Sequence, residues 1–272
     1  MGTEKRNRQK QNRQAAREAR ARQARRAKVR SRATLYGGII AGVLVVVFAI
    51  SQLGGSDDSA PESTDTTFVE EAPSLSSVPG EQITGDTPCP KTDGSQARVT
   101  VFEKAPPTCI DAAKKYTATF DTSEGKIVVD LDTEKTPNTV NNFVVLSRYK
   151  YYDGSYIFRT DPSIDIIQGG GATNSDDPGY SIKDEGNGFT YEEGDLVMAR
   201  TGAPDSAGGQ FFFVTGEKAA LLNSQGTYVV FGKISEGLDV VKTIIGLNSG
   251  SGSLGGAPSR TVEITTVTIT ES

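Results

Sequence analysis

The stretch that decides the fold covers residues 116–148 and reads YTATFDTSEGKIVVDLDTEKTPNTVNNFVVLSR. Apolar and polar residues alternate over 116–120 and again over 127–131, and a Ser-Glu-Gly triplet lies between the two runs. Alternation with a period of two is typical of strands that bury one face, and the triplet favours a tight turn. The sequence therefore predicts an antiparallel hairpin in the first half of this stretch.

The second half of the same stretch predicts a helix. Thr136 is a common N-cap residue, and Pro137 suits the first helical position because its missing N–H needs no partner there. Apolar residues then recur at the three- and four-residue spacing of one helix face. We expect this helix to end near Arg148.

Short apolar segments bounded by Gly, Asp and Pro follow the hairpin and the helix. They occupy residues 156–159, 164–168, 196–200, 210–214 and 228–234, before a second helix at 238–245 and a last alternating strand at 261–270. Many short strands with turn signals and only two helices favour a mainly β fold, a closed antiparallel barrel.

The composition excludes several kinds of site. The 272 residues include no histidine and two cysteines, which excludes a Ser-His-Asp triad, a Cys-His dyad, a histidine metal site and a zinc site of four thiolates. The three glycines at 169–171 lack the GxGxxG spacing and the following helix of a nucleotide-binding loop. We therefore expect neither a metal ion nor a cofactor.

Charge is divided unevenly along the chain. Residues 1–34 contain 13 Lys or Arg and two acids, whereas the whole chain carries a formal charge of -5. Residues 35–53 (LYGGIIAGVLVVVFAISQL) contain no charged residue, and as a helix they span about 28 Å, close to the hydrocarbon thickness of a bilayer. Because positive residues stay cytoplasmic, the sequence predicts a single-pass cell-membrane anchor with a cytoplasmic basic arm and an extracytoplasmic C-terminal part.

Alternatives to this anchor remain open at the level of the sequence. A cleaved signal peptide or a buried helix of a soluble core also fits residues 35–53. A nucleic-acid-binding arm also fits residues 1–34, although we expect no nucleic acid partner and assign the arm to topology and to contact with anionic lipid.

Two further regions precede the folded domain at 115–272. Residues 54–88 are rich in Ser, Thr, Pro, Asp and Glu and poor in aromatic residues, which predicts a disordered acidic stalk. Residues 89–114 form a lead-in flanked by Cys89 and Cys109. In the oxidising compartment that the topology implies, these cysteines are expected to form a disulfide that closes a loop of about 20 residues. Two separately buried thiols are the alternative.

Six stretches between Tyr116 and Thr270 together resemble the cyclophilin family of peptidyl-prolyl cis-trans isomerases. They read GKIVVDLDTEKTPNTVNNFVVL, YYDGSYIFRT, IIQGGG, LVMAR, SAGGQFFFVTG and YVVFGKISEGLDVV, in that order. The resemblance implies an eight-stranded barrel with two helices. The basic arm, single span, acidic stalk and cysteine pair also resemble membrane-anchored cyclophilins of high-GC Gram-positive bacteria.

The resemblance implies functional residues position by position. Arg159 falls on the family's catalytic arginine, Gln168 on the glutamine that helps to hold it, and Phe212 on the phenylalanine of the proline pocket. The other implied substrate-binding residues are Ile166, Arg200, Gln210, Leu221 and Tyr228.

Strand alternation tests this grouping independently of the family. In the run QFFFV, Gln210, Phe212 and Val214 share one face of a strand, and Phe211 and Phe213 share the other. We assign that other face to the core. The strand pattern thus predicts that the glutamine and the pocket phenylalanine lie in one groove. The alternatives are core packing of Phe212, backbone-bonding roles for Gln168 and Gln210, and a surface or structural ion pair of Arg159.

Two departures from the family pattern concern the site itself. Phe158 stands where the family usually has a histidine. The segment 161–165 is one residue longer than the common form and lacks its usual pocket phenylalanine, which predicts a shallower or reshaped proline site.

The resemblance implies an isomerase that assists the folding of extracytoplasmic proteins by rotating X-Pro bonds of proline-containing polypeptides. Such rotation needs an apolar groove and a donor aimed at the prolyl nitrogen, but no nucleophile, metal or titrating base, and Arg159 can supply that donor. The altered segment 161–165 keeps two alternatives open. One is a weakly active or inactive peptide-binding module, and the other is a scaffold of the cell envelope.

Overall fold

The computed structural model describes residues 79–250 and 255–272. The predictions for the basic arm, for the apolar segment 35–53 and for most of the stalk fall outside these residues. Among the helices of the described part, none is both long enough and apolar enough to cross a membrane.

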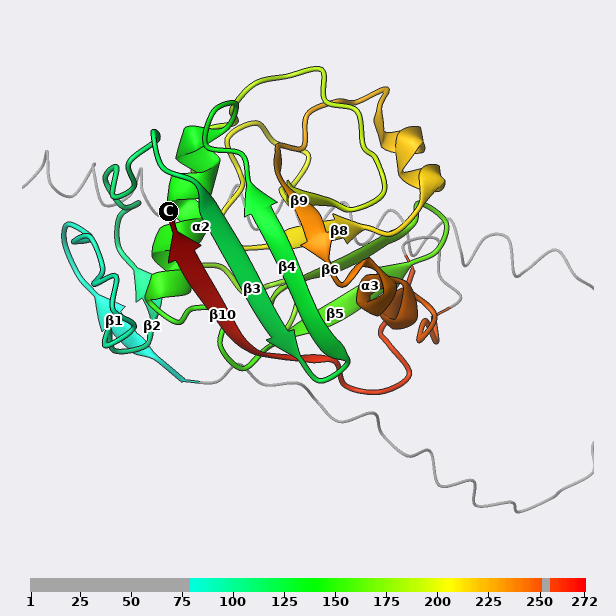
Figure 1. Ribbon diagram of the computed structural model, residues 1–272, viewed down its shortest axis with the longest axis horizontal. Coiled ribbons are helices and arrows are strands. Elements are labelled where there is room, and N and C mark those ends of the chain that lie inside the picture. Colours follow the sequence, from blue (N-terminus) through cyan, green and yellow to red (C-terminus); the bar gives the residue numbers. More distant parts are fainter. Residues whose placement is uncertain (1–78, 251–254) are drawn as a thin grey trace, which may run out of the picture. The chain divides into compact units, whose positions relative to one another are not determined.

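Eight antiparallel strands close into a barrel (Figure 1). In their order around the barrel they are β10 (Glu263–Glu271), β3 (Tyr116–Thr122), β4 (Gly125–Leu131), β9 (Val230–Glu236), β7 (Asp195–Met198), β8 (Phe211–Val214), β6 (Ile166–Gly171) and β5 (Ser155–Asp161). The predicted mainly β fold, a closed antiparallel barrel of eight strands, is confirmed.

The hairpin predicted at the start of the fold-deciding stretch is β3 and β4. Tyr116 pairs with Leu131 and Phe120 pairs with Ile127, and buried residues alternate with more exposed ones along both strands. Gly125 makes the turn with a φ of +136°, a conformation that L-residues rarely adopt.

Two helices and one 3₁₀ turn complete the described part of the domain. Helix α2 (Pro137–Arg148) and helix α3 (Leu238–Ile245) have the predicted extents and lie on opposite sides of the barrel (Figure 1). The 3₁₀ turn η1 (Glu217–Leu222) lies between β8 and β9 in the sequence and was not predicted.

The start of α2 differs from the prediction in one respect. Thr136 occupies the N-cap position, but its side chain caps no N–H of the helix and donates instead to the carbonyl of Asp132. The carboxylate of Glu185 accepts the backbone N–H groups of Asn138 and Thr139, at 3.1 and 2.9 Å. A distant glutamate therefore caps this helix.

Aromatic rings fill the core between the barrel and α2. Phe120 packs against Phe143, Phe211 and Phe213 at centroid distances of 5.3 to 5.8 Å. All four rings are fully buried. The assignment of Phe211 and Phe213 to the core is confirmed.

An N-terminal extension packs against this domain. Strands β1 (Glu81–Ile83) and β2 (Val99–Phe102) form a small parallel sheet, and Phe102 packs edge-on against Tyr149 at the end of α2. The prediction that the disordered stalk continues to residue 88 is therefore wrong for residues 81–88. The sequence pattern misses this short strand because its partner lies 18 residues away.

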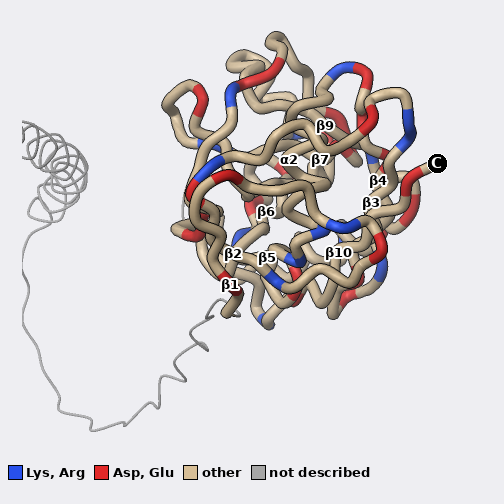
Figure 2. The backbone as a smooth tube through the Cα atoms, turned by 90° about the vertical axis from the view of Figure 1, so that its left-hand side faces the viewer, with Lys and Arg blue, Asp and Glu red and all other residues tan. Residues whose placement is uncertain are grey.

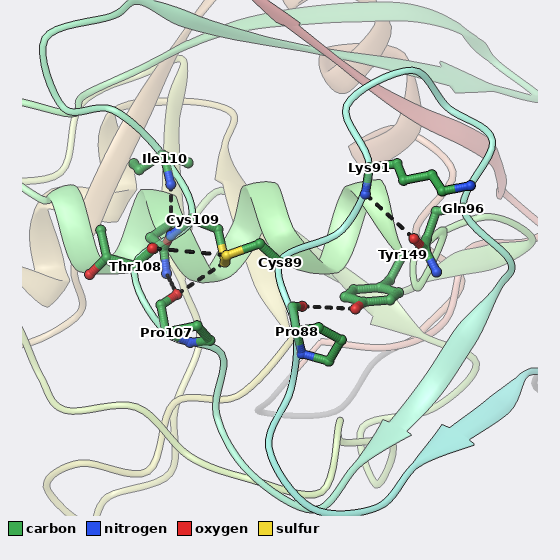
Figure 3. The surroundings of a disulfide bond; sticks show 10 residues. Pro88, Cys89, Lys91, Gln96, Pro107, Thr108, Cys109, Ile110 and Tyr149 are labelled. Atoms are coloured by element: carbon green, nitrogen blue, oxygen red, sulfur yellow. Dashed lines mark hydrogen bonds between the residues drawn. A yellow bond between two sulfur atoms is a disulfide. The ribbon is translucent and has the colours of Figure 1, made fainter.

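The predicted disulfide between Cys89 and Cys109 is present and staples the extension beside α2 (Figure 3). The N–H of Cys109 donates to Oδ1 of Asn141 at 2.7 Å, and the hydroxyl of Tyr149 donates to the carbonyl of Pro88 at 2.8 Å. The two arms of the loop are thus both bonded to this helix, one through Asn141 and the other through Tyr149, which directly follows its last residue.

Charged residues of both signs are interspersed over the domain (Figure 2). Several of them form ion pairs that connect distant parts of the chain. Glu271 near the C-terminus pairs with Lys114 and with Arg148, and Arg260 pairs with Glu124 at the β3–β4 turn.

Candidate functional site

Three neighbouring strands hold the central residues at matching register positions. Arg159 on β5 pairs with Gln168 on β6, and Gln168 pairs with Phe212 on β8. Directly paired residues of an antiparallel sheet point to the same face. Because Phe211 and Phe213 fill the core, this row of three side chains lies on the opposite, outer face of the barrel wall.

A chain of hydrogen bonds fixes the polar side chains of the row. Nη1 of Arg159 donates to Oε1 of Gln168 at 2.9 Å, and Nε2 of Gln168 donates to Oε1 of Gln210 at 3.0 Å. The amide nitrogen of Gln210 in turn donates to the backbone carbonyls of Asn174 and Asp176, at 3.0 and 2.9 Å. Each amide therefore has a defined orientation, and the two glutamines hold the arginine from one side.

Asp161 holds Arg159 from the other side and was not predicted. Its Oδ2 lies 2.6 Å from Nη2 of Arg159. Its Oδ1 accepts the N–H and the hydroxyl of Ser163. The carboxylate is 2% exposed, whereas the arginine side chain is 26% exposed. The i, i+2 spacing on one strand face was the signal that could have identified this pair.

A second apolar cluster, separate from the main core, lies beside this network. Phe212 packs edge-on against Tyr228 at 5.8 Å and lies 6.5 Å from Tyr191. Ile166 and Phe212 are each 3% exposed, so they present only an outer edge. The buried members of the cluster are Ile166, Tyr191, Val197, Ala199, Phe212, Val214 and Ala219.

Two hollows border Gln168 on the surface. The larger, of about 600 Å³, is lined by Arg159, Phe158 and the segments 172–174 and 256–257. The smaller, of about 260 Å³, is lined by Gln210, the segment 199–201 and residues near Asp176. Arg159 thus faces an open hollow, and Phe158 contributes an aromatic wall where the family usually has a histidine.

The other predicted substrate-binding residues, Arg200, Leu221 and Tyr228, do not all lie in the same surroundings. Tyr228 joins the apolar cluster, and the guanidinium of Arg200 lies 5.7 Å above its ring. Leu221 is 66% exposed and does not pack into the cluster, whereas its neighbour Leu222 does. The sequence pattern could not show which of the two leucines faces the cluster, because the 3₁₀ turn was not predicted.

Burial perturbs one tyrosine of the site. It raises the pKa of Tyr191, whose hydroxyl donates to the carbonyl of Tyr228 at 3.1 Å and accepts its N–H at 2.9 Å. The neutral hydroxyl can do both, so it locks the Tyr228 backbone beside Phe212. Within residues 79–250 and 255–272, no group of three or more Asp, Glu or Cys side chains could hold a metal ion.

Comparison with known proteins places this geometry in context. Residues 117–269 match the model of the family described as cyclophilin type peptidyl-prolyl cis-trans isomerase/CLD. The chain is 37% identical over 144 residues to peptidyl-prolyl cis-trans isomerase cyp18 of Streptomyces antibioticus, covering 50% of this chain and 86% of that protein. It is 36% identical over 168 residues to peptidyl-prolyl cis-trans isomerase B of Escherichia coli K12, covering 56% of this chain and 99% of that protein.

A solved structure is similar as well. A Cryptosporidium parvum cyclophilin type peptidyl-prolyl cis-trans isomerase, crystallised in the presence of the dipeptide Ala-Pro, superposes with a TM-score of 0.51 at 26% identity. The match covers 57% of this chain and 98% of that chain.

Proposed function

Because this chain belongs to the cyclophilin-type peptidyl-prolyl cis-trans isomerases, we propose that Arg159 assists the rotation of X-Pro bonds in extracytoplasmic proteins. The isomerase activity follows from the family. The role of Arg159, the site of action and the class of client protein are our proposal.

The reaction needs electrostatic help more than covalent chemistry. Rotation about an amide bond has a barrier of about 18–20 kcal/mol, because the nitrogen lone pair is delocalised into the carbonyl. In the twisted state the lone pair returns to the nitrogen, which can then accept a hydrogen bond. A donor placed there stabilises the transition state more than the ground state and so raises the rate.

The observation that carries the proposal is the fixed position of Arg159. Gln168 and Asp161 hold its guanidinium from two sides, at 2.9 and 2.6 Å, beside an open hollow of about 600 Å³. A guanidinium is always charged and presents its N–H groups in a rigid plane, so little reorganisation is needed during bond rotation. Phe212, which pairs with Gln168 in the sheet register and is 3% exposed, offers its outer edge as an apolar contact for the proline ring.

The row of Arg159, Gln168 and Phe212 on the outer face of the barrel wall, which we call the groove, also indicates the class of substrate. The Cryptosporidium relative crystallised in the presence of Ala-Pro supports an X-Pro peptide as the ligand of this site. Because the site lies on the outer face of the barrel wall, a segment of an unfolded or flexible chain can enter it. The clients are therefore proline-containing polypeptides.

The proposed location rests on the N-terminal sequence and on the disulfide. Thirteen basic residues precede the uncharged segment 35–53, which predicts an inward N-terminus and an outward domain. A disulfide in the described part fits an oxidising compartment. Reporter fusions after Ser56 test this placement, since activity of a reporter that functions only in the cytoplasm would contradict it.

A protease-coupled assay with a proline peptide tests the activity and the role of Arg159 in the full chain. Arg159→Ala is expected to lower kcat/KM by about a hundredfold, the effect of removing one transition-state donor. Arg260→Ala is the matched control, because it removes an exposed arginine that pairs with Glu124 away from the groove. Equal rates for the two variants would contradict the proposed role. Peptide binding without acceleration by the parent chain would instead indicate a binding module.

A further inference from the structure

The segment 181–185 connects helix α2 to the wall of the smaller hollow. At one end, the carboxylate of Glu185 caps α2 through Asn138 and Thr139. At the other end, the N–H of Ile182 donates to the carbonyl of Ala207 at 2.8 Å. Neither contact involves Arg159, Gln168 or Phe212, but together the two contacts hold the segment in place.

Asp184 and Asp205 form a reciprocal clasp across this junction. The N–H of Asp184 donates to Oδ1 of Asp205 at 2.9 Å, and the N–H of Asp205 donates to Oδ2 of Asp184 at 3.1 Å. Asp205 has a φ of +54°, which is uncommon for a residue other than glycine. The clasp therefore holds the segment 199–206, part of which lines the hollow, in a defined conformation.

Arg200 occupies the centre of that segment, and its side chain is committed to internal contacts. Nη1 donates to the carbonyl of Ala203 at 2.7 Å, and Nε donates to the carbonyl of Thr227 at 3.3 Å. The guanidinium lies over the ring of Tyr228, and the side chain is only 9% exposed. Arg200 thus joins the wall of the smaller hollow to the apolar cluster around Phe212.

The other carboxylate oxygen of Asp184, Oδ1, takes no part in the clasp. Oδ1 is buried and accepts no hydrogen bond, yet it lies 3.6 Å from Nε of Arg200. A buried carboxylate oxygen is costly unless a charge compensates it. The guanidinium of Arg200 is that charge, and the carboxylate in turn holds the guanidinium over Tyr228.

We propose that Asp184 is a positioning residue for peptide binding, which acts through Arg200 on the wall of the smaller hollow and on Tyr228. The proposal rests on the outer groove being the substrate site. Because Arg200 lines the smaller hollow and Arg159 the larger one, Asp184 and Arg200 affect how well the peptide is held more than how fast its bond rotates. Loss of the carboxylate charge should therefore raise KM and leave kcat almost unchanged.

Asp184→Asn in the full chain is the test. The amide oxygen can still accept the N–H of Asp205, so the clasp survives while the ion pair with Arg200 is lost. We expect KM for a proline peptide to rise about five- to tenfold and kcat to stay within about twofold. Asp132→Asn is the matched control, because Asp132 also forms an ion pair at 3.6 Å, with Lys135, outside the two hollows.

A second variant shows whether the effect passes through Arg200. Arg200→Met removes the guanidinium and keeps much of the side-chain length, and it should raise KM by a similar factor. In the Arg200→Met background, Asp184→Asn should then add less than about twofold, since the two residues act as one unit. A full five- to tenfold addition in that background would overturn the proposal, as would a fall in kcat at constant KM.

Peptide binding and side-chain NMR separate this proposal from the isomerase proposal. If the parent chain binds a proline peptide without accelerating rotation, the same five- to tenfold loss should appear in the dissociation constant. The Nε–H resonance of Arg200 should shift in Asp184→Asn and stay unchanged in Asp132→Asn. An unshifted resonance in a folded Asp184→Asn protein would contradict the coupling whether or not the enzyme turns over.

Discussion

Asp161→Asn offers a sharp test of how Arg159 is held. The carboxylate of Asp161 accepts from Nη2 of Arg159 on one oxygen and from the N–H and the hydroxyl of Ser163 on the other. An asparagine has one acceptor oxygen and one NH₂ group. Since Ser163 presents two donors, the amide oxygen turns to Ser163 and the NH₂ group faces the guanidinium. The guanidinium of Arg159 then faces an N–H donor in place of an acceptor, so it moves away from the position that it holds in the parent chain.

The magnitude follows from the burial of this pair. Asp161 is 2% exposed and its contact with Arg159 is 2.6 Å, so the variant loses a charge-assisted hydrogen bond that water cannot replace. Such bonds contribute about 1.5–3 kcal/mol, and we expect the free energy of unfolding to fall by a similar amount. If about 1.4–2.8 kcal/mol of that loss appears in the transition state, kcat/KM falls about ten- to a hundredfold.

Two measurements on the same sample check this expectation. Urea denaturation gives the change in stability, and the protease-coupled assay below the transition gives kcat/KM. Glu124→Gln is the matched control, because Glu124 also pairs with an arginine at close range, but at the β3–β4 turn. A folded Asp161→Asn protein with kcat/KM within twofold of the parent would refute the reasoning.

Three further predictions concern stability. Replacing both Cys89 and Cys109 by serine opens a loop with a separation of 20 residues and should lower the free energy of unfolding by about 3 kcal/mol, with kcat/KM unchanged; denaturant titration with and without reductant measures this. Glu185→Ala removes the cap of α2 and should cost about 1–2 kcal/mol; an unchanged urea midpoint would contradict it. Hydrogen bonds from Arg148 and then from Lys114 lower the pKa of Glu271, so its ionised form stabilises the fold above the ordinary pKa of about 4.3. Glu271→Gln should therefore be less stable than the parent at neutral pH, and the difference should shrink as the pH falls through the lowered pKa; a difference that persists in acid would exclude this linkage.

Local sequence patterns predict most of the barrel because its elements follow simple periodicities. Both helices have the expected extents, since each begins and ends at strong local signals. The separation of Phe212 from Phe211 and Phe213 follows from strand alternation alone, and the structure assigns the two faces to different clusters. These features depend on neighbours within a few residues.

Features that depend on distant partners were missed. Strand β1 gains its order from pairing with β2, which lies inside the loop that the disulfide closes. The cap of α2 comes from Glu185, 46 residues beyond Thr139. Neither β1 nor the capping role of Glu185 is indicated by its own local sequence, because a short polar strand or a carboxylate is compatible with many environments.

The candidate site likewise contains residues that the sequence identified and residues that it missed. The family resemblance identified Arg159 and Gln168, and the strand register places them side by side. It did not identify Asp161, because the segment 161–165 departs from the family form there. The position of Leu221 on the exposed side of η1 depends on a 3₁₀ turn, which has no apolar periodicity of its own.

Two-dimensional exchange NMR of a proline peptide at equilibrium, with the parent chain and with Arg159→Lys, tests the role of Arg159 most directly. The method reports bond rotation without a protease, and lysine keeps the charge but loses the planar fork that Gln168 and Asp161 hold. The account predicts rapid exchange with the parent and a loss of at least about tenfold with Arg159→Lys at saturating peptide, which corresponds to about 1.4 kcal/mol. Equal exchange rates for the two proteins would contradict it.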